Sequence, residues 1–395
     1  SNDLVGWERA NTVTVAEVSG VLEKTHNANE TFSGRLLLKD GGELRNSAAD
    51  CLMLWKSAIV EAEANAKASV TGESIKAGNG TPELKVGEGA VLTVSAPLAI
   101  PSGITLRKSG SGTALLNTVS GVGNSWGTLN VAEGTLKTSL SGGFDATLTV
   151  QSGATLEMAG DLNKGGLPAT VNGRLIGYGK LFGGNTNGAL TLGATAEVVA
   201  PAAEETLELA PGNGQAVTIA PGATFVAGAG TLLLTNGYAK GGEGTFAVAL
   251  PKGVTLARGE SLPVLTVGEG KALAAADFTA PQGLTCYAEG RTLFVANLLA
   301  VDRPEGEAEA WAPATLKAVT AAVNALGESG TAVTRVAKVE AKTKGGTAVI
   351  TDVATVNDVL TCFQGCAVAT ANPEDPTAAT VTVSYCLLYT SPSPR

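Results

Sequence analysis

The sequence has little of what the common enzyme and metal chemistries need. Only one of its 395 residues is a histidine, so a Ser-His-Asp or Cys-His mechanism would have to run through His26. A single histidine also excludes the usual imidazole zinc sites. His26 lies in a polar, turn-like stretch, and no nucleophile-elbow motif surrounds any serine. We therefore interpret His26 as a surface residue.

Charged residues, aromatic residues and long apolar runs are also scarce. Charged residues make up 16% of the chain, the net charge is −9, and the lysines and arginines are scattered, so no nucleic-acid partner is expected. No apolar run reaches about 18 residues, which predicts no transmembrane helix. Aromatic residues make up 4%, a value that suits thin stacked coils better than a globular centre.

The five cysteines do not form a metal motif. Cys362 and Cys366 lie four residues apart at the end of a predicted helix, and no second pair matches their spacing. They are either a disulfide, if the last helical turn distorts, or two small buried residues. Cys51, Cys286 and Cys386 stand alone. We predict no catalytic residue, no cofactor and no metal site.

Glycine is abundant, with 51 residues, and it recurs in a repeated phrase. The phrase has two alternating apolar residues, two spacers, a glycine and a second β-type run. Its copies start at residues 84, 129, 148, 217 and 265, with gaps close to two, one, three and two multiples of about 23. They read Leu84-Lys-Val-Gly-Glu-Gly89, Leu129-Asn-Val-Ala-Glu-Gly134, Leu148-Thr-Val-Gln-Ser-Gly153, Val217-Thr-Ile-Ala-Pro-Gly222 and Leu265-Thr-Val-Gly-Glu-Gly270.

This repeat predicts an all-β solenoid. In each copy the apolar side chains point to one face and the polar ones to the other, and the glycine occupies a corner that disfavours a side chain. A coil of about 23 residues holds up to three short strands and buries its inner face only against neighbouring coils. The alternative is an antiparallel sandwich or barrel of hairpins, which predicts no 23-residue register.

One segment resembles the passenger-associated repeat of bacterial autotransporters. It reads Ile104-Thr-Leu-Arg-Lys-Ser-Gly-Ser-Gly112-Thr-Ala-Leu-Leu116, followed by Gly127-Thr-Leu-Asn-Val-Ala-Glu-Gly134-Thr-Leu136. The family repeats L-x-K-x-G-x-G-T-L-x-L and closes with V-x-x-G-T-L; here Thr113-Ala-Leu115 departs slightly from that pattern. The resemblance covers about half the chain. It implies a right-handed parallel β-helix, exposed on a bacterial surface or extracellular, and followed by an outer-membrane barrel.

The chain divides into five regions. Residues 1–76 are expected to form a cap and irregular first coils, with a helical turn or an irregular coil at 58–68, and residues 77–299 the regular solenoid. Residues 300–312 form an acidic linker. Residues 313–385 are expected to form a small α+β module that caps the solenoid, binds a partner or leads to further domains. Its predicted helices are 313–327 and 353–363, and its strands 347–350 and 380–385.

The last ten residues, 386–395, match no family. They read Cys-Leu-Leu-Tyr-Thr-Ser-Pro-Ser-Pro-Arg, which is the translation of a transposon sequencing adapter. We therefore expect the natural chain to diverge from this sequence near Tyr385 and leave residues 386–395 out of the fold prediction.

Three further patterns suggest chemistry but have simpler interpretations. Glu204, Glu205 and Glu208 are close in sequence, as in polysaccharide-active β-helices, but no Lys or Arg is expected one coil away, so we predict a solvated corner. The stretches Gly177-Tyr-Gly-Lys180 and Gly121-Val-Gly123 lack the helix that a phosphate loop precedes. The stretch Gly241-Gly-Glu-Gly-Thr-Phe246 lacks the aspartate of calcium-binding repeats.

The sequence thus favours a non-catalytic cell-surface β-helix, serving as a stalk or adhesin. Its partners are expected to be surface glycans or cell-surface proteins. The alternative is a polysaccharide lyase, a glycoside hydrolase or a glycan-binding module, with charged residues stacked at the coil period.

Overall fold

The computed structural model describes residues 2–3, 16–25, 30–54, 57–117, 127–138, 146–162, 167–183, 188–257, 260–297, 333–343, 346–351, 368–369 and 380–387. The chain divides into two units. The first holds Ser1–Pro251, Pro263–Thr279 and Glu289–Leu293, and the second holds Lys252–Leu262, Ala280–Ala288 and Phe294–Arg395. The described part contains no α-helix, only the short 3-10 turns η2 (Gly212–Gly214) and η3 (Ala275–Asp277).

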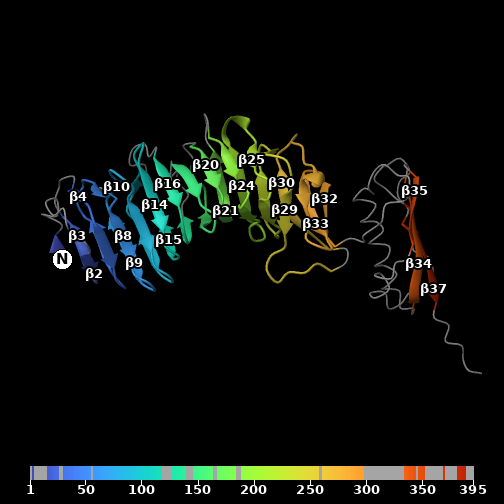
Figure 1. The fold of residues 1–395 in the computed structure, drawn as a ribbon, viewed down its shortest axis with the longest axis horizontal. Helices are drawn as coiled ribbons and strands as arrows, with labels where there is room; N and C mark the ends of the chain where they lie inside the picture. Colours follow the sequence, from blue (N-terminus) through green and yellow to red (C-terminus); the bar gives the residue numbers. More distant parts are fainter. Residues whose placement is uncertain are drawn as a thin grey trace, which may run out of the picture. The chain divides into compact units, whose positions relative to one another are not determined.

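The first unit is a parallel β-solenoid, as the repeat predicts (Figure 1). One face, the long sheet, has eleven strands, and each pairs in parallel with the strand of the next coil. These strands are β2 (Ala16–Val18), β5 (Arg35–Leu38), β8 (Ile59–Ala62), β11 (Glu83–Val86), β14 (Thr105–Ser109), β16 (Thr128–Val131), β18 (Thr147–Val150), β20 (Ala169–Val171), β22 (Leu190–Leu192), β25 (Val217–Ile219) and β28 (Tyr238–Lys240).

A second sheet follows the long sheet within each coil. Its strands are β1 (Asn2–Asp3), β3 (Val21–Lys24), β6 (Glu43–Asn46), β9 (Lys67–Gly72), β12 (Val91–Val94), β15 (Thr113–Leu116), β17 (Thr135–Thr138), β19 (Thr155–Ala159), β21 (Arg174–Gly183), β23 (Glu197–Val199), β26 (Thr224–Val226), β29 (Phe246–Ala249) and β31 (Phe278–Thr279). These pairings are also parallel, for example Leu136 with Leu156 between β17 and β19.

A third face appears at both ends of the stack. The first coils carry β4 (Glu30–Phe32), β7 (Leu52–Leu54), β10 (Ile75–Ala77) and β13 (Leu98–Ala99). In the later coils the second half of β21 pairs with β24 (Thr206–Pro211), then β27 (Thr231–Leu234) and β30 (Ser261–Val267) follow. These coils have the three strands that a 23-residue period allows.

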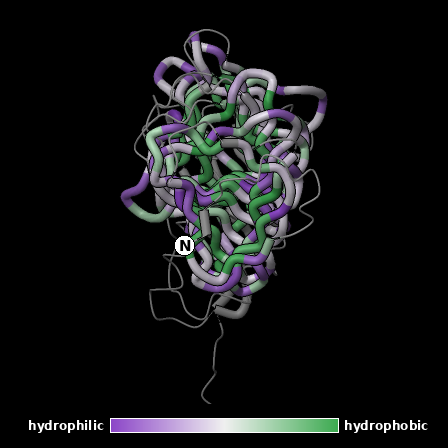
Figure 2. Tube along the Cα trace, turned by 90° about the vertical axis from the view of Figure 1, so that its left-hand side faces the viewer, coloured by the Kyte–Doolittle hydropathy of each residue, from purple (hydrophilic) through white to green (hydrophobic). Residues whose placement is uncertain are grey.

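The core lies inside the coils, where the alternating residues of every strand meet. In β18, Leu148 and Val150 are buried while Thr147 and Thr149 face outward, as predicted. Seen along the stack, hydrophobic segments gather inside and hydrophilic ones lie at the margins (Figure 2). The repeat glycines Gly89, Gly134, Gly153, Gly222 and Gly270 all have positive φ, which confirms their predicted place at corners.

Two details of the coil prediction are wrong. The alanine-rich stretch 58–68 is neither a helical turn nor an irregular coil, because it contains β8 and the start of β9, joined by a turn. The copy at 265–267 lies in β30, where Leu233 pairs with Thr266, and so does not continue the long sheet from β25 through β28. No strand follows its glycine directly, and Lys271 is exposed there.

The second unit contains β32 (Thr285–Glu289) and β33 (Thr292–Ala296) in part, with the Tyr287 ring stacked on Phe294 at 5.3 Å between centroids. It also holds an antiparallel sheet of β35 (Gly346–Thr351), β34 (Val333–Thr343), β37 (Thr380–Leu387) and β36 (Val368–Ala369), in that order. The predicted strands 347–350 and 380–385 are confirmed, and β37 continues through Cys386 and Leu387. The predicted helices 313–327 and 353–363 and the linker 300–312 lie outside the described residues.

Candidate functional site

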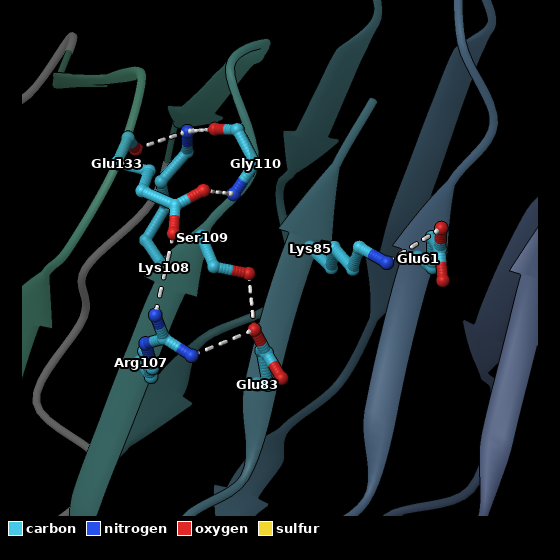
Figure 3. A network of polar contacts seen from close by, with 8 residues as sticks. All are labelled: Glu61, Glu83, Lys85, Arg107, Lys108, Ser109, Gly110 and Glu133. Carbon is cyan, nitrogen blue, oxygen red and sulfur yellow. Dashed lines mark hydrogen bonds and ion pairs between the residues drawn. The ribbon is translucent and has the colours of Figure 1, made fainter. Parts of the chain in front are cut away.

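A network of charged side chains crosses the outer face of the long sheet over β8, β11, β14 and the turn after β16 (Figure 3). Glu61 contacts Arg35 on one side, and on the other lies 3.3 Å from the Lys85 ammonium. Glu61 and Lys85 are register partners on β8 and β11, so the pair follows from coil stacking. Opposite charges placed directly across neighbouring strands stabilise a sheet modestly.

Arg107 joins two further coils of this network. Its guanidinium lies 3.5 Å from a Glu83 oxygen on β11 and 3.5 Å from a Glu133 oxygen after β16. Glu83 also accepts a hydrogen bond from the Ser109 hydroxyl, and Glu133 accepts one from the Gly110 N–H at 3.1 Å. Since the Arg107 side chain is 40% exposed, each of its ion pairs contributes at most about 1 kcal/mol.

Lys108 is the centre of the same region but points inward. Its side chain is fully buried, and its ammonium donates hydrogen bonds of 2.6 Å to the carbonyl oxygens of Gly110, Gly112 and Glu133. Burial lowers the pKa of Lys108 to about 8, partly opposed by the Glu133 carboxylate. The ammonium is the form that donates to all three oxygens at once, so the carbonyl dipoles oppose the effect of burial. We call this arrangement the lysine hub.

The hub explains the spacing of its own sequence motif. Lys108, Gly110 and Gly112 belong to one coil, whereas Glu133 begins the corner of the next, so a single side chain joins consecutive coils. A side chain at Gly110 would overlap the Val86 carbonyl oxygen, and Gly110 has a φ of +71°. Only glycine leaves room for the backbone oxygens to converge on the ammonium.

The acidic trio predicted as a solvated corner separates in the structure. Glu204 is exposed in a turn with a φ of +69°, while Glu208 lies on β24. Contrary to the prediction, a lysine does recur one coil away: Lys180 pairs with Glu208 in register, and its ammonium lies 2.8 Å from the carboxylate. Glu208 also accepts a 2.6 Å hydrogen bond from Thr235. Glu208 is thus a member of an ion-pair ladder.

The glycine-rich candidates are strands or turns. Gly177 and Gly179 lie within β21 with φ of +97° and +102°, where the backbone packs against the coil below. They are packing glycines, and the Lys180 that follows them is committed to Glu208. The stretch 241–246 forms a turn leading into β29. Gly121 and Gly123 lie outside the described residues.

The reactive residue types remain separate within the described residues. Cys51 and Cys286 are free cysteines; Cys51 accepts a 3.0 Å hydrogen bond from Ser74, and burial raises the pKa of Cys286 to about 11. His26, Cys362 and Cys366 lie outside the described part. No group of three His, Cys, Asp or Glu residues within that part is arranged to hold a metal ion.

A second polar cluster closes the later coils. The Tyr238 hydroxyl donates to Asp277 at 2.7 Å and accepts the Ala274 N–H at 3.2 Å, and Lys240 lies 2.9 Å from the same carboxylate. Burial first, and the Asp277 contact after it, raise the pKa of Tyr238 to about 12. The hydrogen bonds from Lys240 and Tyr238 lower the pKa of Asp277. The ring of Tyr238 packs edge-on against Phe278, so this cluster anchors the end of the core.

These contacts favour a structural role for the charged residues. In the network of Figure 3, Glu61, Glu83 and Glu133 each contact at least one cation across a coil boundary. General acid-base catalysis on a glycoside instead needs one carboxyl group in an environment that keeps its proton and a second facing it across the substrate. No helix in the described part is long and apolar enough to cross a membrane. Comparison with family models, curated proteins and solved structures finds no match.

Proposed function

We propose that this chain is a non-catalytic solenoid displayed on a bacterial surface, acting as a stalk or adhesive module in the manner of an autotransporter passenger. The observation that carries the proposal is the lysine hub. Lys108, Gly110 and Gly112 are the lysine and glycines of the resembled L-x-K-x-G-x-G-T motif, and the Glu133 carbonyl belongs to the V-x-x-G-T-L phrase that closes it. The motif residues contact one another across a coil boundary, which gives the resemblance a physical basis.

The distribution of charge supports the same proposal. The carboxylates of the long-sheet network, and Glu208 on another face, pair with cations from neighbouring coils, which suits a stalk that holds its coils in register. A solenoid without a pocket-centred site binds through the long flank of its stacked coils. Surface glycans or cell-surface proteins are the partners that this geometry suits.

Export is the direct test. The full chain, fused to an outer-membrane translocator and produced in a Gram-negative host, should reach the cell surface. There an epitope within the chain should be labelled on intact cells, and the β-strand core should resist added protease. The same fusion carrying Phe225→Asp, which disrupts the core, serves as the matched control and should lose protease resistance. A wild-type fusion that stays periplasmic would count against the proposal.

Turnover tests the enzymatic alternative. The purified chain is incubated with a panel of acidic and neutral polysaccharides, and new reducing ends and unsaturated products are measured. We expect none. Product formation that disappears in a Glu204→Gln, Glu205→Gln, Glu208→Gln triple variant with unchanged melting would establish a polysaccharide-active enzyme instead. Binding on a glycan array without product release would identify the adhesive ligand.

A further inference from the structure

The long sheet divides into a charged part and an uncharged part. From β5 to β14 its outward residues include Arg35, Glu61, Glu83, Lys85 and Arg107. From β16 to β25 every outward strand position is threonine or asparagine. We call this second part the threonine face; its residues are Thr128, Asn130, Thr147, Thr149, Thr170, Thr191 and Thr218.

The threonines stand in columns. Thr149, Thr170, Thr191 and Thr218 are successive register partners on β18, β20, β22 and β25. A second column pairs Thr128 with Thr147, and within β18 the columns lie side by side. Neighbouring strands are about 4.8 Å apart, and outward residues of one strand are about 7 Å apart. The face is therefore a grid of identical side chains with a fixed period in two directions.

The chemistry of the grid suits ordered water. A threonine side chain is stiff at χ1, so the columns present methyl and hydroxyl groups in repeated orientations. Each hydroxyl donates one hydrogen bond and accepts two, as a water molecule of a lattice requires of its neighbours, and the methyl groups order the water beside them. Charged groups hold hydration shells of their own, and none stands among the outward strand positions of this face.

We infer that the threonine face binds ice. A partner with one binding site has no use for a period, whereas a crystal surface matches the same group many times over. The column that carries the face begins beyond Arg107 and Asn130 and ends at Ala239, beside Lys240, so charge bounds the uncharged grid at both ends. Five strands give it a length of only about 19 Å, which predicts adhesion to ice rather than deep freezing-point depression. This inference deepens the proposed function by naming the solid to which the surface adheres.

The test measures uptake of the purified full chain into a slowly grown ice hemisphere, together with ice recrystallisation in a thin frozen film. The parent should enter the ice and keep crystals small. Thr170→Lys with Thr191→Lys places two charges on the grid and should abolish both effects. The matched control, Thr113→Lys with Thr135→Lys, changes two outward register partners on the second sheet and should retain them. Circular dichroism confirms that both variants fold.

Three results would overturn the inference: exclusion of the parent from ice, equal loss in both variants, or unchanged uptake by the Thr170→Lys, Thr191→Lys variant. Retention on cellulose or chitin particles without uptake into ice would assign the face to a polysaccharide. Because uptake is measured on purified protein, failure of export and failure of ice binding are separate outcomes.

Discussion

Replacing Lys108 by methionine removes the charge of the lysine hub while keeping most of the side-chain volume. The ammonium is fully buried and donates to three carbonyl oxygens on two coils, each at 2.6 Å. Methionine fills the same space but donates no hydrogen bond. The variant therefore tests whether the hub holds consecutive coils together or merely occupies the core.

The expected loss follows from opposing terms. A hydrogen bond to a charged group contributes about 1.5–3 kcal/mol, and losing three would cost more than any one of them. Removing the ammonium also removes its desolvation penalty of several kcal/mol, which offsets part of that loss. The Gly112 oxygen keeps the Thr135 N–H as a donor. We expect the free energy of unfolding to fall by about 2–4 kcal/mol.

Guanidinium unfolding followed by far-ultraviolet circular dichroism measures this loss as a lower midpoint at a similar slope. The matched control is Lys85→Met, which removes a lysine 43% exposed and paired with Glu61 on the outer face. That change should cost less than about 1 kcal/mol. If Lys108→Met unfolds at the parent midpoint, or loses no more than Lys85→Met, the reasoning about the hub is wrong.

Three other perturbations test the solenoid core. Phe225→Asp buries an unpaired carboxylate in a fully buried position and should cost several kcal/mol; a parent-like melting curve would show that this side chain faces water. The Tyr238 pKa of about 12, above its usual value of 10.0, means that the folded chain keeps a proton the unfolded chain releases, so the free energy of unfolding should fall as pH rises from 10 to 12. Tyr238→Phe should flatten that slope, and an unchanged slope would exclude Tyr238 as its source. Gly177→Ala, at a φ of +97° and against the carbonyl of β19, should cost more than about 1 kcal/mol, whereas Gly103→Ala, with similar φ but open space, should cost less; equal losses would leave backbone strain alone as the cause.

The solenoid was predictable because its constraints are local and repeated. Alternation fixed which residues of a copy such as 148–153 face the core, and the positive φ of Gly153 follows from its corner position. The period near 23 residues correctly placed one coil between the copies at 129 and 148, and three between 148 and 217. Stacking then required parallel pairing, since each coil advances in the same direction.

The polar contacts were not predictable because they depend on register. The Lys180–Glu208 pair spans 28 positions, and coil lengths vary, so counting a fixed period misses it. The copy at 265 was misplaced for the same reason: a longer excursion between β29 and β30 moves it onto another face. The lysine hub did leave a signal, a lysine at an inward position followed by two alternating glycines, but its third acceptor lies in the next coil.

Coil stacking is the premise of the hub, the charged network and the threonine face, and one distance tests it. Glu83 and Thr218 are joined by six successive register steps along the long sheet. At about 4.8 Å a step, spin labels on Glu83→Cys and Thr218→Cys, with the native cysteines replaced by serine, should lie about 29 Å apart by pulsed electron paramagnetic resonance. A single narrow distribution near that value is the predicted result. A broad distribution, or one centred far from it, would contradict the parallel stack.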